Sequence, residues 1–178
     1  MDDQKIIFLL VGPKGSGKSF IGHLFEEHFG IRFIRVEDWA KRIKRNRDVH
    51  DDSYVREVFI AIEKGIVEAI GVLPSLVFES TGLTGHFDRM YSNLCSKFHV
   101  VPVAITADPM ICVQRVRTRD QSIHIHVSDE EVRDINRLVV QKNLRFPDSI
   151  ENTNKTKEGL IKEIENIINK NTMPDSGH

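Results

Sequence analysis

The sequence has few cysteines, almost no net charge and no long hydrophobic run. Its two cysteines, Cys95 and Cys112, show no C-x-x-C or other metal-ligand spacing, and we interpret both as buried thiols in a reducing compartment. The apolar run near the N-terminus is too short to span a membrane, and it follows the acidic Asp2 and Asp3 rather than basic residues. We therefore expect a cytoplasmic protein with no membrane partner.

The balance of charge excludes a strongly basic protein. Lysine and arginine together number 25, against 26 aspartates and glutamates, for a net charge of −1. This balance argues against a nucleic-acid partner. The 178 residues, 40% of them hydrophobic and 29% charged, are enough for one globular domain with its own core. We expect a domain over 1–170 and a tail over 171–178 that has nothing to pack against; a monomer and a homodimer both remain open.

A glycine-rich segment near the N-terminus gives the strongest pattern in the sequence. It follows the apolar run 6–11, which predicts a strand, and leads into residues with helical spacing, which predict a helix over 17–29. A strand, G-x-x-x-x-G-K-[ST] and a helix together are typical of a phosphate-binding P-loop. The residues of this motif are Gly12, Pro13, Lys14, Gly15, Ser16, Gly17, Lys18 and Ser19.

The residue types of the motif suit a nucleoside triphosphate. Glycines let successive backbone N–H groups curl around an oxyanion, and the following helix directs its free N–H groups to the same place. Lys18 is expected to reach the β- and γ-phosphates, and the Ser19 hydroxyl to ligate Mg²⁺. The motif therefore predicts a protein that binds ATP and Mg²⁺.

The rest of the chain alternates between strand and helix patterns. Such alternation predicts an α/β fold with a parallel sheet, helices on both faces and functional groups at the carboxyl ends of the strands. Further strands are expected at 31–36, 76–78, 100–105 and 146–150. Pro102 argues against a simple central place in the sheet at that residue, because proline has no N–H for a neighbouring strand. Further helices are expected over 39–45, 53–70, 84–98, 109–119, 128–139 and 160–168.

This order of parts resembles the P-loop small-molecule kinases, the group of shikimate kinase, gluconate kinase and the nucleoside monophosphate kinases. The resemblance covers about residues 5–170 and depends on the P-loop, the acidic pair Glu37 and Asp38, the Walker-B-like Glu79, and a late arginine-bearing stretch. It implies a three-layer α/β/α fold whose five-stranded parallel sheet has the order 2-3-1-4-5. It also implies a lid at about 115–128 and transfer of the γ-phosphoryl group of ATP to a small molecule.

The acceptor cannot be transferred from any subgroup of this family. Shikimate kinases carry Asp-x-Asp where this chain reads Arg35-Val36-Glu37-Asp38, and three glycines where it reads Ser80-Thr81-Gly82. Monophosphate kinases carry Asp-Gly-Phe-Pro-Arg at the second of these places. Shikimate-like, sugar-acid-like and nucleotide-like acceptors therefore all remain open.

Three residues outside the P-loop are candidates for catalysis. Glu79 ends a hydrophobic strand, so its carboxylate could help to hold Mg²⁺ or accept the proton of the acceptor hydroxyl; alternatively it only bonds a backbone N–H. Arg115 and Arg119 stand at i, i+4 near the base of the lid and could stabilise the charge of the transferring phosphoryl group.

Four residues are candidates for binding the acceptor: Glu37, Asp38, Arg42 and Gly82. Glu37 and Asp38 could equally cap the basic helix that follows, since aspartate is a good N-cap residue. Most basic clusters such as Lys41, Arg42, Lys44, Arg45 and Arg47 are simply solvated, but Arg42 is best placed among them to bind an anion. His124 and His126 are interpreted as lid surface rather than as a metal site, and Arg133 as the ion-pair partner of Asp129.

Two other functions fit parts of the sequence. Glu79-Ser80-Thr81-Gly82 and Asn154-Lys155-Thr156-Lys157 imitate the D-x-x-G and N-K-x-D motifs of GTPases, so a GTPase or another NTPase is the main alternative. The final lysine cannot accept hydrogen bonds from guanine as a carboxylate does. A kinase that acts on nucleic-acid ends is a third possibility, against which the near-neutral charge counts.

Overall fold

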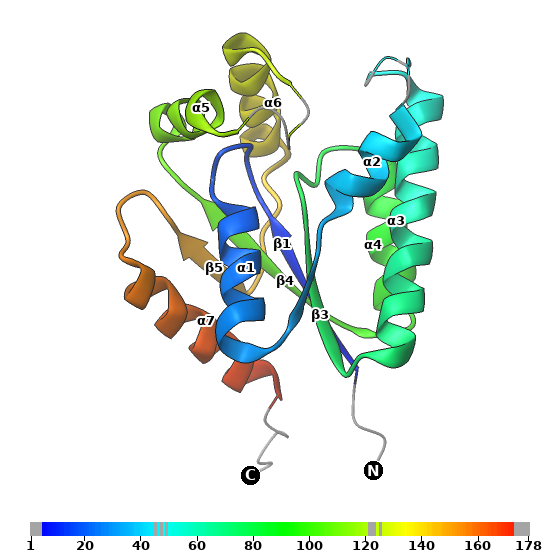
Figure 1. Cartoon of the computed structure of the whole chain (residues 1–178), viewed down its shortest axis with the longest axis vertical. Coiled ribbons are helices and arrows are strands. Elements are labelled where there is room, and N and C mark those ends of the chain that lie inside the picture. Colours follow the sequence, from blue (N-terminus) through cyan, green and yellow to red (C-terminus); the bar gives the residue numbers. More distant parts are fainter. Residues whose placement is uncertain are drawn as a thin grey trace.

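The protein is a single sheet of five parallel strands with helices on both faces, in this computed structural model (Figure 1). The structure describes residues 5–44, 46, 48, 50–120, 124 and 126–172. The strand order is β2-β3-β1-β4-β5, which confirms the predicted order 2-3-1-4-5.

The elements follow one another in an alternating sequence. They are β1 (Ile6–Val11), α1 (Lys18–Phe29), β2 (Arg32–Ile34), α2 (Val36–Lys44), α3 (Asp52–Val72), β3 (Ser75–Ser80), α4 (Gly85–Cys95), β4 (His99–Thr106), α5 (Pro109–Thr118), α6 (Asp129–Lys142), β5 (Asp148–Glu151) and α7 (Lys157–Thr172).

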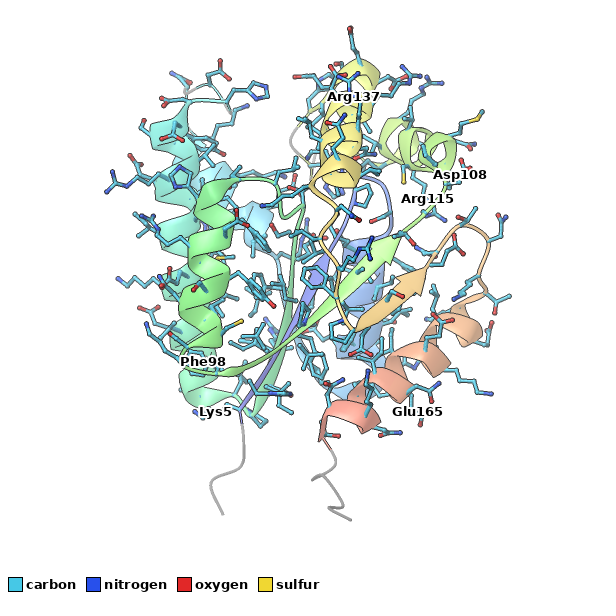
Figure 2. The ribbon with its side chains drawn as sticks, turned by 180° about the vertical axis from the view of Figure 1, so that it is seen from behind. Lys5, Phe98, Asp108, Arg115, Arg137 and Glu165 are labelled. Carbon is cyan, nitrogen blue, oxygen red and sulfur yellow. The ribbon has the colours of Figure 1, made fainter. Side chains whose placement is uncertain are left out.

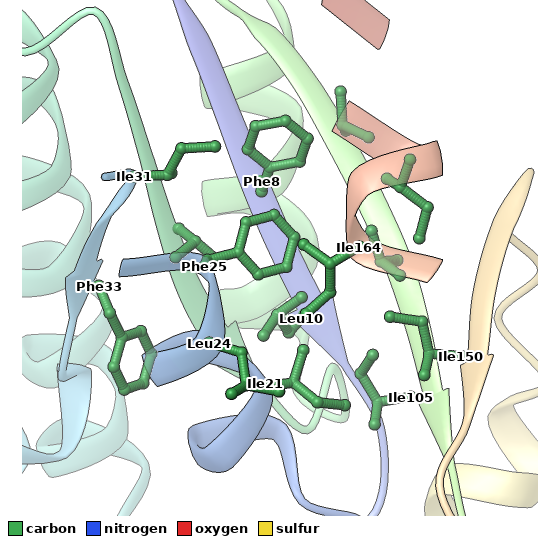
Figure 3. Close-up of a cluster of buried hydrophobic side chains, with 14 of the residues drawn as sticks. Phe8, Leu10, Ile21, Leu24, Phe25, Ile31, Phe33, Ile105, Ile150 and Ile164 are labelled. Atoms are coloured by element: carbon green, nitrogen blue, oxygen red, sulfur yellow. The ribbon is translucent and has the colours of Figure 1, made fainter. Parts of the chain in front are cut away.

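Strand β1 lies at the centre of the sheet and is buried along its whole length. Successive side chains of a strand point to opposite faces, so its six apolar residues divide between two cores. Ile6, Phe8 and Leu10 pack with α1 and α7 on one face (Figure 3). Ile7, Leu9 and Val11 pack with α3 and α4 on the other. This double burial explains why the strand is a continuous apolar run instead of an alternating one.

Helices α5 and α6 do not cover a face of the sheet. They pack on each other beyond the carboxyl ends of the strands, where Val113, Val116 and Val132 form a small core of their own (Figure 1). Helix α2 and the N-terminal part of α3 lie on the other side of the same edge (Figure 1). The P-loop, residues 12–17 between β1 and α1, therefore lies between two groups of helices.

The second strand and the helix after it differ from the prediction. Strand β2 ends at Ile34, and α2 begins at Val36 rather than at Trp39. Glu37 and Asp38 consequently lie inside the first turn of α2, where carboxylates interact favourably with the helix dipole, and Asp38 is not the N-cap. The alternating pattern of residues 31–36 predicted a longer strand than the structure has, because the alternation continues through Val36, the first residue of α2.

Pro102 lies in β4 at a place where only one neighbouring strand pairs with it. Strand β4 lies between β1 and β5, but β5 pairs with it only from Val103 onward. Pro102 therefore lies in the part of β4 that has β1 as its one neighbour in the sheet, and a residue without an N–H is tolerated at such an edge.

Several smaller predictions require correction. Cys112 is buried, but Cys95 is exposed at the end of α4. On the helix predicted over 128–139, Leu138 is 50% exposed, whereas the polar Asn136 is buried. Asp129 pairs with Arg117 rather than with Arg133.

The C-terminal prediction is only partly covered by the structure. Helix α7 extends through Thr172, and the Asn171 side chain donates hydrogen bonds to Asp148 and to the Ile167 carbonyl. The first two residues of the expected tail are thus helical. Residues 173–178, like Arg45 and Arg47 of the basic cluster, lie outside the described residues.

Candidate active site

The P-loop requires glycine for two separate reasons. Gly15 and Gly17 have φ angles of 81° and 93°, which L-residues with a side chain rarely adopt. The loop also packs closely against its neighbours: a Cβ at Gly12 would lie 2.0 Å from the carbonyl oxygen of Ile105, and one at Gly15 would lie 2.1 Å from that of Cys112. The backbone thereby keeps the curled path that the motif predicted.

Lys18 points into the curled loop. Its side chain is almost fully buried, and its ammonium donates hydrogen bonds to the carbonyl oxygens of Gly12 and Pro13 at 2.8 and 2.7 Å. Burial lowers its pKa to about 8, although the nearby carboxylate of Glu79 opposes the shift. The loop therefore holds a desolvated cation where a phosphate group is expected.

The lowered pKa of Lys18 makes nucleotide affinity depend on pH. Before nucleotide binds, the ammonium loses its proton as the pH rises through about 8, whereas phosphate oxygens in contact with it raise the pKa again. Above that pH, binding must take up a proton, so we expect the affinity for ATP to fall by up to about tenfold per pH unit. Calorimetry at about pH 9, in buffers of different ionisation enthalpy, measures the uptake. Uptake unchanged in Lys18→Ala would contradict this assignment.

Ser19 and Glu79 meet beside the loop. The Ser19 hydroxyl donates a hydrogen bond of 2.7 Å to Oε1 of Glu79. The contact follows from the topology, because β3 pairs directly with β1 and places Glu79 opposite Leu10, just before the loop begins. Mg²⁺ in nucleotide sites binds one or two protein oxygens together with phosphate oxygens and water, and these two side chains fit that requirement. No group of three or more His, Cys, Asp or Glu side chains within the described part of the chain could hold a metal by itself.

Two asparagines from the C-terminal half fix the shape of the loop. Asn136 of α6 accepts a hydrogen bond from the Lys14 N–H at 2.7 Å and donates one to the Lys14 carbonyl at 2.9 Å. Asn152, which follows β5, donates one of 2.9 Å to the carbonyl of Ser16. Both side chains are buried. The sequence analysis missed them as site residues, although one signal was available: Asn136 stands four residues after Val132, on the apolar face of its helix.

Loss of the Asn136 amide should destabilise the loop and the whole domain. Alanine at this position leaves the N–H and C=O of Lys14 without their partner, which destabilises the fold by about 2–3 kcal/mol. We also expect weaker ATP binding, because the loop loses its fixed shape. Urea unfolding and calorimetry measure the two effects. Arg137→Ala, one residue further along α6 and exposed, is the matched control and should change neither.

Arg115 and Arg119 both line the central cavity but have different surroundings. Arg115 lies above the carboxyl ends of β4 and β5 (Figure 2) and donates to the carbonyl oxygens of Asn152 and Thr153 at 2.8 and 3.2 Å. Burial lowers the pKa of Arg119, and the carboxylates of Glu37 and Glu79 oppose that shift. Arg115 is thus held by backbone near the loop, whereas Arg119 faces the carboxylates of the site.

The cavity has a volume of about 540 Å³ and lies between the P-loop, α2, α3 and the α5–α6 pair. Glu37 lines it and forms a hydrogen bond of 2.9 Å with Nδ1 of His124. His126 also lines it. The two histidines, interpreted from the sequence as lid surface, thus contribute to the cavity wall. The predicted lid over 115–128 is described only in part, because 121–123 and 125 lie outside the described residues.

Three of the candidate acceptor-binding residues do not line this cavity. Asp38 and Arg42 are exposed, and Nε of Arg42 donates to the backbone oxygen of Asp38. Gly82 has a φ of 76°, and its backbone forms a turn in which its N–H bonds Ser80 and its carbonyl bonds Lys142. Of the four candidates, the structure brings Glu37 alone to the cavity.

Known structures share this architecture at low sequence identity. Shikimate kinase from Acinetobacter baumannii in complex with shikimate aligns over 96% of both chains with 16% identity and a TM-score of 0.64. A gluconokinase from Sinorhizobium meliloti aligns over 94% of this chain and 93% of its own, with 14% identity and a TM-score of 0.62. APS kinase from Mycobacterium tuberculosis in complex with AMPPNP and APS aligns over 93% and 98%, with 10% identity and a TM-score of 0.65. The fold is that of the P-loop small-molecule kinases.

Sequence comparison adds nothing to this structural similarity. Neither a protein-family model nor a curated protein sequence matches the chain. Within the part of the chain that the structure describes, no helix is long and apolar enough to cross a membrane.

Proposed function

We propose that this protein is a phosphotransferase that uses ATP and Mg²⁺ to phosphorylate a small molecule. The observation that carries the proposal is the contact of Ser19 with Glu79 beside the buried Lys18, at the wall of a cavity large enough for an acceptor. The structural neighbours support the reaction type, because shikimate kinase, a gluconokinase and APS kinase all have this fold.

Each side chain has a definite task in this proposal. Lys18 contacts the β- and γ-phosphates, and the loop N–H groups hold the remaining oxygens. Ser19 and Glu79 hold Mg²⁺, which neutralises charge on the phosphates when it is bound. Arg119 is the guanidinium best placed for the γ-phosphoryl group, since it lies in the field of the Glu79 and Glu37 carboxylates.

The transfer step requires a proton acceptor in the cavity. The oxygen of an acceptor hydroxyl forms a bond to the γ-phosphorus, the bond from that phosphorus to the β,γ-bridging oxygen breaks, and ADP leaves. The hydroxyl proton passes to a base. Oε1 of Glu79 faces Ser19, so we assign this role to the second oxygen of the same carboxylate.

The test is ADP release with ATP and Mg²⁺ across a set of hydroxyl, carboxyl and nucleoside monophosphate acceptors. We expect release that depends on an acceptor and on Mg²⁺, with ATP preferred to GTP in competition. The GTPase-like segment supports this preference: Lys155 pairs with Glu163 and Lys157 with Glu27 on the surface, and Thr156 bonds the N–H of Gly159 near the start of α7. Hydrolysis of GTP at a higher rate than any acceptor-dependent use of ATP would contradict the proposal.

A further inference from the structure

The apolar stripe of α3 divides into two parts with different surroundings. Ile66 and Ile70, in its C-terminal half, are completely buried against the sheet. In its N-terminal half, Val55 and Phe59 are only half-buried and line the cavity beside the buried Tyr54 and Val58. The N-terminal half of the stripe therefore contributes to the wall of the cavity as well as to the core.

Other elements complete this apolar surface. Helix α2 contributes Val36 and Ala40, and β3 and α4 contribute Phe78 and Met90. The opposite wall, from the α5–α6 side, consists of Val116, Val127 and Ile135. Away from the P-loop, the cavity is thus apolar on facing walls, which favours a ligand surface that gains by leaving water.

The charged groups of the acceptor side are carboxylates paired with histidines. Glu37 lies 2.9 Å from His124, and Glu131 lies 3.7 Å from His50. The cavity wall also carries Lys14, Lys18, Arg115 and Arg119, which belong to the P-loop, the start of α1 and the end of α5. Of the described residues of α2 and α3, none that lines the cavity is a lysine or an arginine. Within the described residues, a negatively charged group that lies against α2 and α3 would therefore face carboxylates and no lysine or arginine of those two helices.

We infer that the acceptor is a hydroxyl compound with an uncharged, apolar body. Its hydroxyl lies at Glu79, and its body lies against Val55 and Phe59 of α3. Burial of a carboxylate or phosphate group beside these side chains would remove its hydration without supplying a partner. This inference rests on the proposed function, because Glu79 fixes the reacting end.

The apolar surface also continues out of the cavity. A neighbouring hollow of about 810 Å³ shares His50, Leu83, Thr84, Glu131 and Ile135 with the cavity and extends along α6 to Leu138, Gln141 and Lys142. An acceptor longer than the cavity thus has a path toward solvent along Leu83, Ile135 and Leu138, bordered by charged side chains. Acceptors with a longer apolar chain should accordingly bind more tightly.

The experiment compares two acceptors that differ in one group. 4-Methylbenzyl alcohol and 4-(hydroxymethyl)benzoate have the same hydroxyl and ring, but the second replaces the methyl group by a carboxylate. Calorimetry with ADP and Mg²⁺ present measures binding of each, and ADP release from ATP measures transfer. We expect the methyl compound to bind at least about tenfold more tightly. In the series from benzyl alcohol to 4-phenylbutanol, each methylene should tighten binding about fourfold.

Matched variants of α3 locate the effect. Phe59→Ala should weaken binding of 4-methylbenzyl alcohol about tenfold, while Phe59→Leu retains most of the affinity. Ile60→Ala is the control, since Ile60 is 49% exposed and does not line the cavity; it should leave the affinity unchanged. Unchanged binding of ADP and Mg²⁺ by each variant shows that the P-loop is intact.

The outcomes separate this inference from the proposed function. Equal or tighter binding of the benzoate overturns the inference, as does failure of both compounds to bind at millimolar concentration, and neither result affects the kinase assignment. A protein that binds no ATP, or that consumes ATP without regard to any acceptor, overturns the proposed function itself.

Discussion

Lys18→Ala is expected to lower kcat by two to three orders of magnitude, equivalent to about 3–4 kcal/mol in the barrier. The variant removes the ammonium that the loop holds toward the phosphates, where negative charge spreads during transfer. The site is buried, so no solvent cation replaces it at the same position. Steady-state ADP release at saturating ATP measures the effect.

The fold should survive this substitution. Lys18 contributes a desolvated charge rather than apolar packing, and its pKa, lowered to about 8 by burial, shows that the protein disfavours the charged form at this position. The melting temperature should therefore stay close to that of the wild type. Lys97→Ala is the matched control. Lys97 is exposed and lies just before β4, at the amino end of that strand, whereas the P-loop lies at the carboxyl ends of the strands. A well-folded Lys18→Ala protein with wild-type ATP turnover would refute the kinase assignment.

Glu79→Gln is expected to abolish most of the transfer and to leave ATP binding largely intact. The amide oxygen of glutamine can still accept the hydrogen bond of Ser19, so local geometry is preserved. The amide cannot take the proton of an acceptor hydroxyl and holds Mg²⁺ less well. We expect kcat to fall by about 10²–10⁴-fold, measured beside ATP affinity by calorimetry.

A second carboxylate serves as the control for Glu79. Glu63 accepts hydrogen bonds from the Asn93 amide, which joins α3 to α4 away from the P-loop. Glu63→Gln should therefore change stability slightly and transfer not at all. If Glu79→Gln instead transfers phosphate normally and melts several degrees lower, the Glu79 carboxylate is structural.

The parts of this protein that the sequence predicts are those with local causes. The P-loop motif places its glycines, Lys18 and Ser19 within eight consecutive residues, and the continuous apolar run before it marks a strand buried on both faces. Strand order followed from family resemblance rather than from periodicity. The start of α2 at Val36 was not predicted, because Val36 also fits the end of the alternating segment 31–36.

The parts that the sequence does not predict depend on contacts between distant segments. The apolar face of its helix marks Asn136 as a buried polar residue, but no local pattern shows that Asn136 and Asn152 bind the backbone of the P-loop, since this depends on where α6 and β5 lie in the fold. For the same reason, Glu37 and Asp38 were equal candidates, although only Glu37 faces the cavity. Likewise, the periodicity of α3 predicts an apolar face but not which of its residues line the cavity.

The attachment of the P-loop by distant asparagines has a consequence for protein synthesis. When the first half of the chain has left the ribosome, the complete glycine motif and its flanking strand and helix have been made. The backbone groups of Lys14 and Ser16 still lack their hydrogen-bond partners Asn136 and Asn152, which lie 122 and 136 residues further along the chain. A growing chain therefore carries the entire nucleotide-binding signature long before it can hold that loop in shape. We therefore expect a growing chain to bind ATP only after the segments that carry Asn136 and Asn152 have been made and have folded.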